Sequence, residues 1–142
     1  MKYEYGMTYP PDADGRFRKR PLVEIEIVGP QGKLKELALV DSGADRSLFH
    51  REIAEYLGID LTHAERRRTI GVTGEAEVLY TEVAITLAGA QKQIPIPVGF
   101  IDMPYVSALL GQEGFFDAHR ITFERYHSIF EISPIKQKQK RA

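Results

Sequence analysis

The residues best suited to chemistry are Asp41, Ser42 and Gly43, which directly follow an apolar run. The run Leu37–Val40 predicts a buried strand, and Gly43 permits a sharp turn after it. The carboxylate of Asp41 is therefore expected at a rigid strand end, where it could serve as a general acid or base. Asp, Ser and Gly are also common turn residues, so the tripeptide alone favours an ordinary surface turn. The apolar strand before it and the extended segment 46–49 after it favour a catalytic loop.

A second motif farther along the chain supports this interpretation. Ala108–Gly111 is a short apolar segment that ends in a glycine. Together with Asp41–Ala44, it resembles the paired motifs of retropepsins, the homodimeric aspartic peptidases of retroviruses and their cellular relatives. The resemblance covers residues 21–132. The stretch Gly114–Asp117, with the sequence Gly-Phe-Phe-Asp, is similar to one found after this glycine in cellular and prokaryotic relatives.

The resemblance implies a mostly β subunit: a closed β-barrel with one or two short helices that forms a homodimer and acts on protein or peptide substrates. It gives the catalytic role to Asp41, without a cofactor or metal ion. Support of the active-site loop falls to Ser42, Gly43 and Ala44. Substrate binding falls to Gly43 and Asp45 of the loop and to a flap hairpin that comprises Ile70, Gly71, Val72, Thr73 and Gly74. Packing behind the loop falls to Leu110 and Gly111.

Two positions depart from the family pattern. Retroviral members usually carry an arginine after the glycine of the second motif, where this chain has Gln112. The change removes the expected ion-pair partner of Asp45. The flap also has one glycine fewer than the most glycine-rich flaps, because Val72 and Thr73 stand between its glycines.

Hydrolysis by paired carboxylates requires two of them on opposite sides of one water molecule. Two like charges at such a short distance favour a pair that shares one proton, so that one member activates water while the other polarises the carbonyl. The chain carries the Asp-Ser-Gly sequence once, at Asp41. A single copy would supply half a site, and a two-fold axis would bring the two halves together. We therefore expect a homodimer with an Asp41/Asp41 dyad.

Composition limits the other function classes. The chain has 142 residues, 43% of them apolar, which suits one domain with a real core. Its net charge of −1 gives no general attraction to nucleic acid or membranes. It has no cysteine, and its histidines, His50 and His63 among them, form no His-Glu-x-x-His pattern. No apolar signal core follows Met1, so we expect a cytoplasmic protein.

The remaining chain divides into three parts. Residues 1–20 read as an N-terminal arm with an edge strand, because apolar and polar residues alternate over its first half. The domain proper is expected over 21–132, with a hairpin at 22–40, a short helix before Gly58, an edge strand at 93–101 limited by its prolines, a short helix from 112, and a last hairpin. Residues 133–142 are expected to form a basic, disordered tail.

Three interpretations of the motif remain open. The first is the aspartic endopeptidase. The second is a peptidase-like binding or dimerisation module with little or no turnover, which would tolerate Asp41→Asn. The third, a serine hydrolase that uses Ser42, lacks a Gly-x-Ser-x-Gly elbow. Arg66, Arg67 and Arg68 form a solvated face in the simplest interpretation, with the holding of acidic substrate residues as the alternative.

Overall fold

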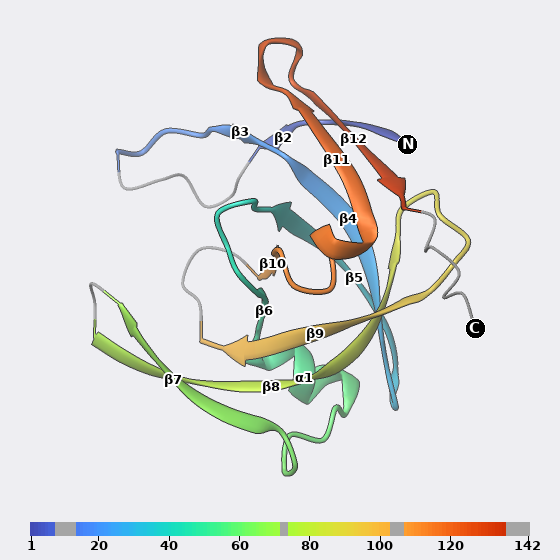
Figure 1. The fold of residues 1–142 in the computed structure, drawn as a ribbon. Coiled ribbons are helices and arrows are strands. Elements are labelled where there is room, and N and C mark those ends of the chain that lie inside the picture. The colour runs from blue at the N-terminus through green and yellow to red at the C-terminus, as the bar shows by residue number, and fades with distance from the viewer. Residues whose placement is uncertain (8–13, 72–73, 103–106, 136–142) are drawn as a thin grey trace, which may run out of the picture.

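The computed structural model describes residues 1–7, 14–71, 74–102 and 107–135 of the chain, which are mostly β (Figure 1). Its strands are β1 (Lys2–Glu4), β2 (Gly6–Met7), β3 (Lys19–Arg20), β4 (Leu22–Gly29), β5 (Gly32–Val40), β6 (Ser47–His50), β7 (Glu65–Gly71), β8 (Gly74–Leu87), β9 (Ile94–Ile101), β10 (Ala108–Leu110), β11 (His119–Glu124) and β12 (Ile129–Pro134). Its helical segments are α1 (Arg51–Leu57) and two 3-10 turns, η1 (Phe116–Ala118) and η2 (Arg125–His127).

Six strands close into a barrel in the order β4-β5-β10-β6-β9-β8, because β8 also pairs with β4. The pairs β5–β10 and β6–β9 are parallel, and the other pairs of the ring are antiparallel. β7 lies outside the ring and pairs with β8 as a hairpin. The prediction of a mostly β, closed barrel is confirmed, with α1 as its one α-helix among the described residues.

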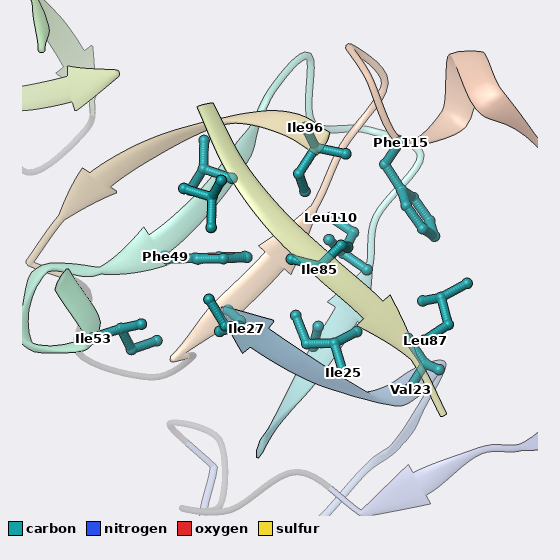
Figure 2. Packing of buried hydrophobic residues seen from close by; sticks show 14 of the residues in the cluster. Val23, Ile25, Ile27, Phe49, Ile53, Ile85, Leu87, Ile96, Leu110 and Phe115 are labelled. Atoms are coloured by element: carbon teal, nitrogen blue, oxygen red, sulfur yellow. The ribbon is translucent and has the colours of Figure 1, made fainter. Parts of the chain in front are cut away.

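The barrel interior is filled by alternate side chains of its strands. Val23, Ile25 and Ile27 of β4 are buried, as the alternation of this segment predicts. Ile25 and Ile27 lie close to Ile85 of β8 and to Leu110 of β10 in the interior (Figure 2). β5, the strand that leads to Asp41, adds Ala38 and Val40 to the same apolar core, which makes its end a rigid platform.

The segment after β6 forms the predicted short helix. The side chain of His50 caps α1 by accepting a hydrogen bond from the Glu52 backbone N–H, at 3.1 Å between Nδ1 and N. Gly58 ends α1 in the left-handed conformation, with φ of 67°, as glycine does at many helix ends. His50 therefore has a structural role in this helix cap.

β9 differs from the expected edge strand, because it lies between β6 and β8 within the barrel. The prolines remain compatible with this place for a simple reason. β9 pairs with β8 over 94–100 but meets β6 only over 98–101, so Pro95 and Pro97 have a neighbouring strand on one side. A proline can occupy a strand position that need not donate a hydrogen bond to the ladder.

The two ends of the described chain form a separate three-stranded sheet in the order β1-β12-β11. β1 is an edge strand within the arm at residues 1–20, and β12 runs to Pro134, so the first two residues of the expected tail, Ser133 and Pro134, are in a strand rather than disordered. The helix expected from 112 is replaced by turns that lead into η1. Residues 136–142 of the expected tail lie outside the described residues.

The arm is held by Tyr3, which predicts an effect of pH on stability. Its ring stacks on Phe130 at 5.3 Å between centroids, and its hydroxyl donates to the Ala88 carbonyl at 2.8 Å. Burial raises the pKa of Tyr3 above its ordinary value of 10.0. As the pH rises, the unfolded chain therefore releases the Tyr3 proton at a lower pH than the folded chain does. The contribution of Tyr3 to the free energy of unfolding is present below pH 10.0 and is lost as the pH rises above it.

We expect Tyr3→Phe to lower the free energy of unfolding by about 1 kcal/mol near neutral pH, because Ala88 loses its hydrogen bond. It should also lessen the loss of stability as the pH rises above about 10, the ordinary pKa of tyrosine, measured by thermal unfolding. Tyr126→Phe is the matched control, since Tyr126 is 78% exposed. An alkaline loss of the same size in Tyr3→Phe and in the unmodified chain would contradict this assignment.

Candidate active site

Asp41 is the first residue after β5, and its backbone and side chain are both held. Its N–H donates to the Leu110 carbonyl at 2.9 Å, which continues the parallel pairing of β5 with β10. Its carboxylate accepts a hydrogen bond from the Gly43 N–H, at 2.9 Å from Oδ1 to N. The side chain is half-buried. The carboxylate is therefore fixed at the barrel rim with room to meet a ligand.

The next residues form a short turn that closes on itself. The Ala44 N–H donates to the Asp41 carbonyl at 3.3 Å. Ser42, Gly43 and Asp45 are exposed, whereas Ala44 is half-buried. A Cβ atom on Gly43 would lie 3.3 Å from Oδ1 of Asp41, which is a tight contact. The lack of a side chain at this position thus keeps the space beside the carboxylate open.

The segment behind this turn fits it closely. Leu110 is fully buried, and β10 places it opposite Val40. A Cβ atom on Gly111 would lie 2.5 Å from the Arg46 carbonyl oxygen and 2.7 Å from that of Ala44, so a side chain has no room here. The structure therefore places Leu110 and Gly111 behind the loop, which is the position that the resemblance to retropepsins implies.

Ser47 completes this support, although the sequence did not single it out. It is fully buried, and its Oγ accepts a hydrogen bond from the Gly111 N–H at 3.0 Å. A buried N–H without a hydrogen-bond partner would be costly. This bond therefore holds Gly111 in a fixed position next to β6. The sequence feature that could have pointed to Ser47 is a small hydroxyl residue at the inward-facing position two residues before Phe49.

Gln112 compensates in part for the arginine that the family pattern leads one to expect. Its side-chain Nε2 donates to the Ser42 carbonyl oxygen at 2.6 Å. Its backbone N–H donates to the Ala44 carbonyl oxygen at 2.9 Å. The Glu113 N–H donates to the Asp45 carbonyl at 2.9 Å. The loop is thus braced through its own backbone carbonyls rather than through an ion pair to the Asp45 side chain.

The loop also contacts the β7–β8 hairpin. The Arg46 guanidinium carbon lies 4.7 Å from the centre of the Tyr80 ring on β8, and Nε of Arg46 lies 3.1 Å from Glu113 Oε2. Arg67 of β7 approaches the same ring at 5.8 Å and pairs with Glu65. Arg67 and Arg68 have exposed side chains, each with a glutamate partner, which agrees with a solvated face.

The hairpin carries the residues predicted for substrate binding. In its backbone register Ile70 lies opposite Glu75, and Gly71 lies opposite Gly74. Val72 and Thr73 lie outside the described residues. The binding role of these five residues stays a prediction.

Among the described residues, no cluster of three or more His, Asp or Glu side chains is placed to hold a metal ion. No helix in this part of the chain is long and apolar enough to cross a membrane.

The family model of aspartyl proteases matches residues 23–113. This stretch is more than half of the chain and runs from β4 to the residues just after Gly111. The chain belongs to the aspartyl protease family. More specifically, this is an aspartyl protease family of the retropepsin-like clan, as the two motifs indicated. The match covers the whole barrel of the aspartyl protease, including the Asp41 loop and the β7–β8 hairpin, and it ends before η1 and the β11–β12 hairpin. No curated protein matches the chain.

Proposed function

We propose that the chain is an endopeptidase that works as a homodimer, with Asp41 of each subunit forming one catalytic dyad. The observation that carries the proposal is the fixed place of Asp41 at a strand end, on a loop braced by the second motif. Asp41 is the one Asp in the sequence that is followed by Ser-Gly or Thr-Gly. The others are Asp45, beside the motif, and Asp12, Asp14, Asp60, Asp102 and Asp117. One chain therefore supplies one half of a two-carboxylate site.

The chemistry follows from placing two such carboxylates on either side of a water molecule. Two carboxylates at such short range share one proton, as they do in aspartic proteases generally. The ionised carboxylate takes a proton from water as the oxygen attacks the scissile carbonyl. The protonated carboxylate donates a hydrogen bond to that carbonyl, and the tetrahedral intermediate then collapses with transfer of a proton to the leaving amine.

The loop residues take supporting roles in this proposal. The hydroxyl of Ser42 is exposed and would hydrogen-bond across the dimer axis, bracing the two loops against each other. The open space at Gly43 would let the substrate backbone approach the carboxylates. Ala44 and Asp45 would lie beside the substrate main chain. We propose that the enzyme is cytoplasmic. Its substrates would be unfolded or extended segments of proteins.

The β7–β8 hairpin would serve as the flap. Residues 74–78 of β8 pair with β7 and precede the stretch that pairs with β9, so in the described chain the end of the hairpin extends past the barrel (Figure 1). Such an extension has free backbone groups that can bind an extended peptide and can exclude water on closure. Ile70, Gly71, Val72, Thr73 and Gly74 would lie above the substrate.

The test is the cleavage of an unfolded protein substrate from acid to neutral pH, over a dilution series in which the oligomeric mass is measured in parallel. Because each monomer holds half a site, activity per chain should fall as the dimer dissociates, and the rate should then vary with the square of the chain concentration. Constant activity per chain in solutions shown to be monomeric would contradict the shared dyad. A stable dimer that cleaves nothing would instead favour the binding or dimerisation module.

A further inference from the structure

The contact between Arg46 and Tyr80 joins the loop of Asp41 to the proposed flap. Arg46 lies five positions after Asp41, and its guanidinium reaches the ring of a residue on β8. Tyr80 lies opposite Glu65 in the hairpin register and opposite Gly99 of β9. The Arg46 side chain therefore spans from the loop of Asp41 to the base of the hairpin, the two parts between which the proposed function places the substrate.

This guanidinium is held in place before any ligand binds. The Arg46 backbone carbonyl lies against Gly111, and the Glu113 that pairs with Nε has its own N–H bonded to the carbonyl of Asp45. The Tyr80 ring covers the guanidinium, and cation–π contacts of this kind favour a fixed position. The Arg46 side chain is 28% exposed, so it is partly withdrawn from water yet reachable. An ordered, partly desolvated cation binds an anion at a low entropic cost.

Glu113 does not exhaust the hydrogen-bonding capacity of Arg46. A guanidinium has five N–H donors, and one carboxylate uses at most two of them. The Glu113 side chain is 53% exposed, and ion pairs of such exposure contribute little free energy because water screens them. Arg67, by contrast, offers both Nε and Nη2 to one Glu65 carboxylate, at 2.8 and 2.7 Å. Arg46 is therefore the better placed of the two arginines to accept a second carboxylate.

We propose that Arg46 is a specificity-determining residue that binds an acidic side chain of the substrate. This inference rests on the proposed peptidase function and names a class of substrate for it: peptides with Glu or Asp at a fixed distance from the scissile bond. In a two-fold dimer, Arg46 occurs once on each side of the dyad. The preference should consequently appear at two positions placed symmetrically about the cleaved bond.

The experiment begins with the cleavage of a mixture of unfolded proteins by the unmodified enzyme, in which mass spectrometry of the products identifies the positions enriched in Glu or Asp. Peptide pairs that differ by Glu or Gln at the enriched position then give a ratio of kcat/KM. The ratio should be about tenfold in favour of Glu at a pH above about 5, where the side chain is ionised. It should decline toward one as the pH falls below the ordinary pKa of glutamate.

Arg46→Gln should reduce this Glu-to-Gln ratio to about one, whatever its effect on the absolute rate, and Arg46→Lys should retain part of it. Arg68→Gln is the matched control, because it removes one positive charge from the hairpin at a side chain that is 79% exposed. The control should keep the ratio of the unmodified enzyme.

Cleavage without acidic enrichment, or an unchanged ratio in Arg46→Gln, would overturn the inference while the proposed function stands. An equal loss of the ratio in Arg68→Gln would also overturn it, because the preference would then come from the general charge of the hairpin. The absence of any cleavage by a dimeric enzyme is a separate result, which would overturn the proposed function and this inference with it.

Discussion

Replacement of Asp41 by asparagine is expected to reduce kcat for peptide cleavage by at least about 10³-fold. The amide can neither take a proton from water nor hold the shared proton that polarises the carbonyl. The fold should be retained, because the asparagine Oδ1 can still accept the hydrogen bond that Asp41 accepts from the Gly43 N–H. The change also removes the single negative charge that the proton-sharing dyad carries, so dimer formation should not weaken. The measurement is cleavage of an unfolded protein, with circular dichroism and oligomeric mass on the same samples.

The matched control is Asp102→Asn, which changes an exposed carboxylate just after β9 and should leave cleavage within about twofold. Mixing gives a second test. If unmodified and Asp41→Asn chains exchange subunits, an excess of the variant should suppress the activity of the unmodified chains, because mixed dimers carry one carboxylate. Full cleavage by Asp41→Asn, or unaffected activity in an exchanged mixture, would contradict the dyad.

Local patterns in the sequence account for much of the barrel. The alternation of buried and solvent-facing residues in β4 follows from a two-residue period, and the burial of Val23, Ile25 and Ile27 bears this out. The α1 helix was readable because its apolar residues share one face and Gly58 provides its end. The strand before Asp41 was also readable, but its run Leu37–Val40 is buried only in part, because Ala38 and Val40 point inward whereas Leu37 is 53% exposed. Each of these signals is complete within a few neighbouring residues.

The contacts that brace the loop could not be read in this way. Ser47 and Gly111 are 64 positions apart, and their hydrogen bond exists because β10 lies next to β6 in the closed barrel. The same holds for Arg46 and Tyr80, which no local pattern connects. The interior place of β9 was missed because its prolines indicate an edge strand. Since β6 pairs with β9 only from Val98 onward, Pro95 and Pro97 have a paired strand on one side only. Tertiary arrangement, rather than local preference, decides each of these cases.

Gly111→Ala is expected to lower the free energy of unfolding by about 3 kcal/mol, with a fall in Tm on the order of 10 °C. The added Cβ would lie 2.5 Å from the Arg46 carbonyl oxygen and 2.6 Å from its carbonyl carbon. These atoms belong to the backbone, so relief requires a shift of the loop rather than a rotation of a side chain. The loop that moves carries Asp41, and a displacement of about 1 Å in a catalytic group can reduce the rate about 10²-fold.

Gly6→Ala is the matched control, because the nearest atom to its added Cβ is Cδ1 of the Leu22 side chain at 3.3 Å, which can rotate away. It should change the free energy of unfolding by less than about 1 kcal/mol and leave cleavage unaltered. Thermal unfolding and cleavage of one unfolded substrate, measured on both variants, separate the two effects. If Gly111→Ala proved as stable and as active as Gly6→Ala, the close fit of the second motif against the 44–46 backbone would not be what positions the catalytic loop. The bracing would then have to come from Gln112 and its hydrogen bond to the Ser42 carbonyl, which would remain in place without the glycine.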